Sequence, residues 1–123
     1  MKTILAIDQS TSATKAILFN EMGELLDKTA VPHAQLYPRP GWVEHDAAEI
    51  YRHTLQAVSE LLARSPQQRG NLTCLSLTNQ RETIVVFDKT SGEPLYNAIV
   101  WQCRRGEAIC AELAAAGHGF LVQ

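Results

Sequence analysis

Residues 3–19, TILAIDQSTSATKAILF, decide the fold class. The stretch opens with a short apolar run that ends in Asp8, passes through the polar turn QSTSAT, and continues in a second apolar run, KAILF. Two apolar runs joined by a short turn rich in hydroxyl side chains predict neighbouring strands. Residues 24–33, ELLDKTAVPH, predict a third strand. We therefore expect the chain to begin with an antiparallel meander.

The segment after the meander predicts a loop and then a helix. Residues 35–45, QLYPRPGWVEH, are interrupted by Pro and Gly and are typical of a loop. Asp46 is a good helix N-cap, and Glu49 three residues later completes a capping-box pattern. The helix should stop near Ser65, because a proline follows it.

Three further elements complete the predicted fold. Residues 71–77, NLTCLSL, predict a buried strand, and residues 83–101 predict a hairpin around a Ser-Gly turn. Residues 104–117, RRGEAICAELAAAG, predict a second amphipathic helix that ends at Gly117. Strands combined with intervening helices indicate an α/β layer architecture with a mixed sheet.

The overall composition excludes several classes of protein. With 123 residues the chain has the length of one domain, and 11 basic against 13 acidic residues argue against a nucleic-acid-binding surface. The apolar stretches are far too short to span a membrane, and no basic amphipathic helix suggests a membrane surface. The chain has three cysteines without C-x-x-C pairing and four scattered histidines, a pattern that fits the reducing cytoplasm and no zinc site.

The turn after the first predicted strand is a candidate phosphate site. Asp8 stands at the carboxyl end of that strand, and the turn supplies the hydroxyls of Thr11, Ser12 and Thr14 close to backbone N–H groups. Lys15 adds a positive charge. Such a turn can bind a phosphate, while the carboxylate orients a magnesium ion and its waters. The pattern is neither a P-loop nor a dinucleotide fingerprint, and an ordinary hairpin turn is the alternative interpretation.

A second candidate site is the charged pair Arg81–Glu82, within TNQRET at residues 78–83. The pair lies between two apolar runs, and neighbouring side chains of a continuing strand point to opposite faces of a sheet. Both side chains can reach one small ligand only if the strand has ended and the backbone is irregular there. The alternative is a solvated charged pair at a strand end.

Four motifs, in this order along the chain, resemble the amino-terminal part of the FGGY carbohydrate kinases. They are AIDQSTSATKAILF (6–19), YPRPGWVEHD (37–46), TNQRET (78–83) and YNAIVWQCRR (96–105). The third and fourth resemble most specifically the glycerol kinases of that family. The resemblance runs over about residues 3–116. It implies a ribonuclease H-like fold of the actin, Hsp70 and hexokinase superfamily, with a mixed sheet and flanking helices.

The resemblance implies roles for the residues of the first turn. ATP would be the co-substrate, and Asp8 would help to hold its magnesium ion, through water. The phosphates of ATP would be bound by the residues of the turn and the strand after it: Thr11, Ser12, the backbone at Ala13, and Lys15.

For the second candidate site, the resemblance implies that Arg81, Glu82 and Trp101 contact a small polyol. A glycerol hydroxyl both donates and accepts, so a guanidinium and a carboxylate can satisfy it together. Trp101 would cover the carbon skeleton and exclude water, with its indole N–H still requiring a partner. An aromatic side chain that only packs the hairpin is the alternative for Trp101. The implied product is glycerol 3-phosphate.

Two residues depart from the family pattern. Most relatives have Gly where this chain has Ser10, and a Cβ there narrows the approach of a phosphate, although the Ser hydroxyl offers a hydrogen bond instead. Lys15 replaces an Arg and offers a point charge in place of a bidentate fork. Both changes are compatible with altered ATP affinity or with another polyol.

The resemblance implies an incomplete amino-terminal domain. We expect residues 1–123 to be the first part of kinase domain I, with the catalytic base, the adenosine site and domain II in sequence outside this chain. The chain alone is then expected to be inactive, and its exposed sheet edges favour self-association. Two alternatives remain: a kinase for another polyol or sugar such as a pentulose, and a nucleotide-binding module of the Hsp70 or actin type.

Overall fold

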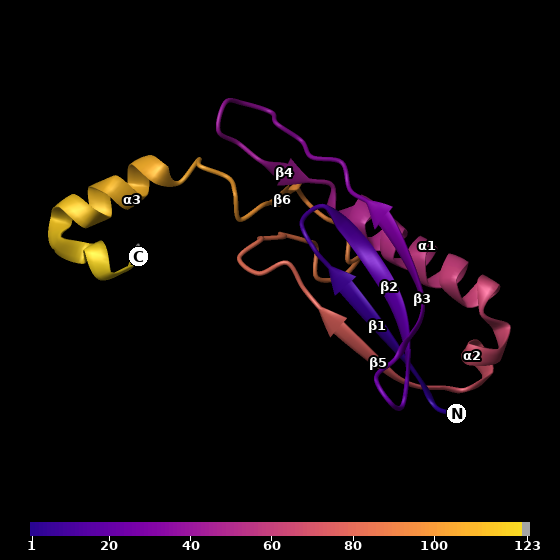
Figure 1. Ribbon diagram of the computed structural model, residues 1–123. Coiled ribbons are helices and arrows are strands. Elements are labelled where there is room, and N and C mark those ends of the chain that lie inside the picture. The colour runs from indigo at the N-terminus through magenta and orange to yellow at the C-terminus, as the bar shows by residue number, and fades with distance from the viewer. Residues whose placement is uncertain (122–123) are drawn as a thin grey trace.

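The computed structural model describes residues 1–121; residues 122 and 123, the last two of the predicted domain, lie outside the described part. Four strands form one mixed sheet in the order β3-β2-β1-β5 (Figure 1). The first three are antiparallel neighbours, and the fourth pairs parallel with β1. The sheet strands are β1 (Thr3–Gln9), β2 (Ala13–Asn20), β3 (Leu25–Pro32) and β5 (Leu72–Thr78). The predicted meander and mixed sheet are confirmed.

One helix, α1 (Ala47–Arg64), covers one face of this sheet and packs on β2 and β3. Burial alternates along β1 and β2, so that every second side chain points toward α1. The core between sheet and helix is apolar: Leu5, Ile7, Ala16, Leu18, Val31, Ala57 and Leu61. This core fixes β1, and therefore the turn that follows it.

The start of α1 follows the predicted N-cap. The Asp46 carboxylate accepts hydrogen bonds from the backbone N–H groups of Ala48 (2.9 Å) and Glu49 (3.2 Å). The second half of the predicted capping box is not formed, because the Glu49 carboxylate turns toward the next helical turn and lies 3.7 Å from His53 Nε2. The helix ends at Arg64, as expected, and a short helix, α2 (Pro66–Gly70), follows.

The prediction that residues 71–77 form a buried strand is wrong. β5 lies at the edge of the sheet with one neighbour, β1, and all its residues are exposed (Figure 1). Leu75 and Leu77 are 59% and 62% exposed. The apolar run is typical of a strand covered on both faces, but α1 packs over β2 and β3 and leaves β5 uncovered.

The loop predicted for residues 35–45 contains a strand, which corrects that prediction. The backbones of Leu36 and Glu44 exchange two hydrogen bonds of 2.9 Å and close a hairpin. Its end, β4 (Glu44–His45), pairs antiparallel with β6 (Ala98–Ile99) in a second, small sheet. The Pro and Gly residues therefore mark the tip of a hairpin.

The predicted hairpin at residues 83–101 is confirmed in outline. Ile84 and Ile99 exchange backbone hydrogen bonds of 2.9 Å, and Gly92 has a φ of 77° in the turn. Only two residues of the returning arm form regular strand, and these are the residues of β6.

The second predicted helix is shorter than expected. α3 (Glu107–Leu113) begins three residues late, because the Arg104 backbone N–H donates to Gly41 O at 2.7 Å and keeps the chain in a turn. An irregular turn, Ala114–His118, follows, in which Gly117 leaves the helical conformation with a φ of 88°. α3 projects away from the sheet, and all its residues are exposed (Figure 1).

Over the described residues, no helix combines the length and apolar character needed to cross a membrane.

Candidate functional site

The candidate site lies where the carboxyl ends of β1 and β5 meet. Asp8 and Thr78 are register partners in these parallel strands, so the turns that follow them leave the sheet side by side. Ligands of open α/β sheets commonly bind outside the carboxyl ends of strands. Here the two turns border a cleft of about 440 Å³, lined by Asp8, Gln9, Ser10, Thr11, Asn79, Gln80, Arg81, Glu82 and Trp101.

The turn after β1 is held tightly from inside and from β3. The backbone N–H and the hydroxyl of Ser10 both donate to Ala13 O, at 3.1 and 2.9 Å. From the β3 side, His33 N–H donates to Ser12 O at 2.9 Å, and the Gln35 amide donates to Thr11 O at 3.0 Å. The backbone at Ser10 lies outside the left-handed region, so the absence of glycine there causes no strain.

Asp8 presents an ionised carboxylate at the edge of the cleft. Lys15 Nζ lies 3.2 Å from one of its oxygens, and the Thr78 hydroxyl donates to the other at 3.0 Å. The Lys15 hydrogen bond and then the Thr78 hydrogen bond lower the pKa of Asp8 and outweigh the opposing effect of burial. Lys15 is therefore engaged with Asp8 and does not line the cleft.

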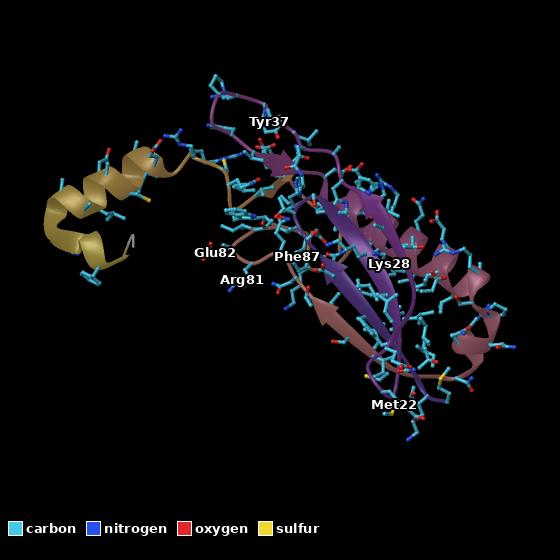
Figure 2. All side chains as sticks on the ribbon, viewed as in Figure 1. Met22, Lys28, Tyr37, Arg81, Glu82 and Phe87 are labelled. Atoms are coloured by element: carbon cyan, nitrogen blue, oxygen red, sulfur yellow. The ribbon has the colours of Figure 1, made fainter. Side chains whose placement is uncertain are left out.

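The backbone at Arg81–Glu82 is irregular, as a shared ligand requires. β5 ends at Thr78, and Glu82 adopts a φ of 63°, in the left-handed region that is uncommon for residues other than glycine. Arg81 and Glu82 both line the cleft, and they lie together on the turn beyond the end of β5 (Figure 2). The turn is braced by Gln80, which accepts a 2.9 Å hydrogen bond from the Thr83 hydroxyl.

Trp101 connects the two turns. Its indole N–H donates to Thr11 Oγ1 at 2.8 Å, and its backbone N–H donates to Thr83 Oγ1 at 3.4 Å. The side chain is 53% exposed and borders the cleft. The indole N–H, which needed a partner, thus finds it in the predicted phosphate turn.

A buried carboxylate supports the segment that carries Trp101. Glu44 is 1% exposed and accepts hydrogen bonds from Tyr96 Oη (2.9 Å), Asn97 Nδ2 (2.9 Å) and Arg105 Nη2 (2.6 Å). Burial raises the pKa of Glu44, but these three hydrogen bonds together lower it below its ordinary value. Glu44 therefore fixes the chain on both sides of Trp101.

The structure brings together five of the eight site residues predicted from the sequence: Asp8, Thr11, Arg81, Glu82 and Trp101. Ser12, Ala13 and Lys15 lie on the same hairpin but outside the lining of the cleft. Three further residues that line the cleft were not predicted: Gln9, Asn79 and Gln80. Gln9 ends β1, Asn79 follows the end of β5, and Gln80 stands next to Arg81, and these positions were the available signal.

Comparison with known proteins decides the family. The family described as "FGGY family of carbohydrate kinases, N-terminal domain" matches residues 3–121. The chain belongs to the FGGY family of carbohydrate kinases. As an FGGY chain it has the expected α/β fold of the actin-like superfamily. The family match also favours the kinase interpretation over a chaperone- or filament-type module.

Several glycerol kinases resemble this FGGY chain. Glycerol kinase 1 of Thermotoga maritima is 50% identical over 114 residues, which are 93% of this chain and 23% of that protein. The glycerol kinase of Symbiobacterium thermophilum is 53% identical over 114 residues, again 93% and 23%. The chain thus spans about a quarter of the length of the curated relatives it matches.

Solved kinase structures agree with the fold. The Plasmodium falciparum glycerol kinase with ADP superposes with a TM-score of 0.83 at 37% identity, covering 94% of this chain and 23% of that one. A xyloylose kinase from Brucella ovis superposes with a TM-score of 0.86 at 27% identity, covering 94% and 24%.

Proposed function

We propose that this chain is the polyol- and phosphate-binding part of a longer ATP-dependent kinase that phosphorylates glycerol to glycerol 3-phosphate. The observation that carries the proposal is that residues of the turn after β1 line the same cleft as Arg81, Glu82 and Trp101. The similarity to glycerol kinases at 50% and 53% identity supports glycerol as the polyol.

The polyol end of the cleft suits a small molecule with adjacent hydroxyls. The Arg81 guanidinium donates hydrogen bonds and the Glu82 carboxylate accepts them, so together they satisfy both functions of a hydroxyl. The half-exposed ring of Trp101 offers an apolar surface for the carbon skeleton.

The phosphate end is the turn after β1. Thr11 lines the cleft, and its hydroxyl would donate to a phosphate oxygen. Ser12 and the backbone at Ala13, which lie on the same hairpin outside the cleft lining, would contribute further contacts. Lys15 would add positive charge beside them. These contacts would hold the transferring group in place and stabilise its charge.

Asp8 is suited to a magnesium ion that keeps most of its water. Its two oxygens each accept one hydrogen bond, so lone pairs remain for water molecules of the ion. Among the described residues, no group of three or more His, Cys, Asp or Glu side chains could hold a metal directly. A magnesium ion bound with ATP would neutralise charge on the phosphates.

None of the cleft residues is free to act as the general base. Asp8 is paired with Lys15 and Thr78, and Glu82 is assigned to hydrogen bonding of the polyol. We infer that the carboxylate that accepts the proton of the attacking hydroxyl comes from sequence outside this chain, as does the adenosine site. Closure of the complete enzyme around both substrates would then exclude water.

A pentulose or another polyol is the second candidate substrate. The similarity to the Brucella ovis xyloylose kinase, at 27% identity, favours keeping this class in the assay. The intact protein that contains this chain should be purified and its ATP consumption measured with glycerol, other polyols and pentuloses. If a pentulose gives the highest kcat/KM, the proposed substrate becomes that pentulose and not glycerol.

Arg81→Ala and Glu82→Ala in the intact protein are each expected to raise the polyol KM about 30-fold and to leave the ATP KM nearly unchanged. Each substitution leaves the other charge and a substrate hydroxyl underpaired, a loss of about 2 kcal/mol. Steady-state kinetics with each substrate varied measure the effect. Arg104→Ala is the matched control, since Arg104 pairs with Glu107 at 2.8 Å outside the cleft. Unchanged polyol kinetics in both test variants would make the pair an ordinary surface feature.

Asp8→Asn is expected to lower kcat about 10- to 100-fold at saturating magnesium and to leave polyol binding intact. Outer-sphere partners of a metal typically have effects of this size, and the neutral amide no longer balances the ion. Turnover is measured as ADP release, and polyol binding by calorimetry. Normal turnover would exclude the turn after β1 as the place where the phosphates and their ion bind.

A further inference from the structure

The hydrogen bond between Trp101 and Thr11 joins two parts of the cleft that are 90 residues apart in the chain. Thr11 belongs to the turn after β1, and Trp101 follows β6 (Ala98–Ile99). Both side chains line the cleft. At 2.8 Å, the indole N–H donates directly to the Thr11 hydroxyl oxygen.

This hydrogen bond restricts the direction in which the Thr11 hydroxyl can donate its own hydrogen. A threonine hydroxyl has one donor and two acceptor positions. When the indole N–H occupies an acceptor position, the hydroxyl hydrogen must point away from the ring. Among the described residues, the Thr11 hydroxyl forms one hydrogen bond, the one that it accepts from Trp101, and no acceptor takes its hydrogen. The hydrogen is therefore left for a ligand in the cleft.

Trp101 is also tied to the turn that carries Arg81 and Glu82. Its backbone N–H donates to the Thr83 hydroxyl, and that hydroxyl donates to Gln80 Oε1 at 2.9 Å. A ligand that contacts the ring of Trp101 and the turn at residues 79–83 therefore acts on the same hydrogen-bonded chain that ends at Thr11.

We propose that Trp101 is a positioning residue for the phosphate site: its indole N–H orients the Thr11 hydroxyl as a donor toward a nucleotide phosphate, which couples polyol binding to nucleotide binding. This inference rests on the proposed function and adds a role for Trp101 at the nucleotide end of the cleft. A polyol that orders the ring lowers the cost of ordering Thr11, so each ligand strengthens binding of the other by the same factor.

The test is a double-mutant cycle in the intact protein that contains this chain. Trp101→Phe keeps an aromatic surface and removes the N–H. Thr11→Ser keeps the hydroxyl, and Thr11→Val removes it without changing the shape of the side chain. The probe is the non-hydrolysable ATP analogue AMP-PNP with magnesium, titrated by calorimetry with and without saturating glycerol, together with the KM values for ATP and glycerol.

Trp101→Phe is expected to weaken AMP-PNP binding about 2- to 10-fold in the wild-type and Thr11→Ser backgrounds. In the Thr11→Val background it should cause no further loss, because the hydroxyl that it orients is absent. The strengthening of AMP-PNP binding by glycerol should also fall toward a factor of one. If the ring has only a structural role, Trp101→Phe should weaken AMP-PNP binding equally in the Thr11→Ser and Thr11→Val backgrounds.

Two results separate failure of this inference from failure of the proposed function. If the wild type phosphorylates a polyol and Trp101→Phe leaves AMP-PNP affinity and the effect of glycerol unchanged, the coupling role is wrong and the proposed function stands. If the wild type neither binds AMP-PNP nor phosphorylates any polyol, both are wrong.

A second measurement does not require Trp101 to be replaced. With 15N-labelled tryptophan, hydrogen exchange of the Trp101 indole N–H is expected to be slow in the wild type and Thr11→Ser and faster in Thr11→Val. Trp42, the other tryptophan of this chain, serves as the internal reference. Equal exchange of the Trp101 N–H in all three proteins would overturn the proposal.

Discussion

The 123-residue chain alone is expected to transfer no phosphoryl group to glycerol at a useful rate. In the proposed function, the residues around its cleft bind the substrates and neutralise charge, and none is free to take the proton from the attacking hydroxyl. General-base catalysis accelerates a reaction about 10²- to 10⁴-fold, and fixed orientation of the reactants increases the rate further. In the proposed function both come from sequence outside this chain. Release of ADP from ATP with glycerol and magnesium measures the rate.

The intact protein assayed under the same conditions is the control, and rates of about 1–100 per second are typical of kinases. Turnover of the isolated chain in this range would contradict the assignment of the base to other sequence. Weak glycerol binding by the isolated chain, with a Kd in the millimolar range, is still expected, since Arg81, Glu82 and Trp101 come from one continuous segment.

The parts of the fold that depend on local sequence could be predicted. The apolar runs on either side of the turn after β1, and Asp46 at the start of α1, are short-range signals, and the structure follows them. The irregular backbone at Arg81–Glu82 could also be inferred, because two adjacent side chains can share a ligand only where a strand has ended. The φ of 63° at Glu82 is the form which that irregularity takes.

The parts that depend on contacts distant in sequence could not be predicted. Whether the run at residues 71–77 is covered depends on where α1 packs, and α1 packs over β2 and β3. The parallel register of β1 and β5, which sets Asp8 beside Thr78, has no local signal either. The Trp101–Thr11 hydrogen bond depends on this register and on the small sheet of β4 and β6, so sequence patterns could not predict it.

The burial of Glu44 could not be predicted from the sequence either, because Glu44 belongs to a segment predicted to be a loop. It becomes buried because the hairpin of Leu36 and Glu44 closes and β6 pairs with β4. Its carboxylate then accepts three hydrogen bonds from the segment around Trp101: from Tyr96, Asn97 and Arg105. The guanidinium of Arg105 also lies 3.8 Å from the ring centre of Trp42.

Glu44→Ala is expected to lower the free energy of unfolding of the chain by about 3–5 kcal/mol, a large part of the roughly 5–15 kcal/mol typical of a domain. The substitution leaves the mostly buried Arg105 without its carboxylate and removes the acceptor of Tyr96 and Asn97. Urea unfolding followed by circular dichroism measures the change. The residue before Arg105 offers a matched control: Arg104 forms an ion pair with Glu107 at 2.8 Å, but both side chains are exposed.

Glu107→Ala should therefore change stability far less than Glu44→Ala, because exposed ion pairs contribute little. The pH dependence gives a second criterion. The folded pKa of Glu44 lies below its ordinary value of 4.5, so the carboxylate contributes its full stabilisation above pH 4.5 and loses it as the pH falls through the lower, folded value. The difference in stability between wild type and Glu44→Ala should accordingly be constant near neutral pH and narrow in acid. Equal losses for Glu44→Ala and Glu107→Ala, or a difference independent of pH, would show that Glu44 does not hold the segment around Trp101.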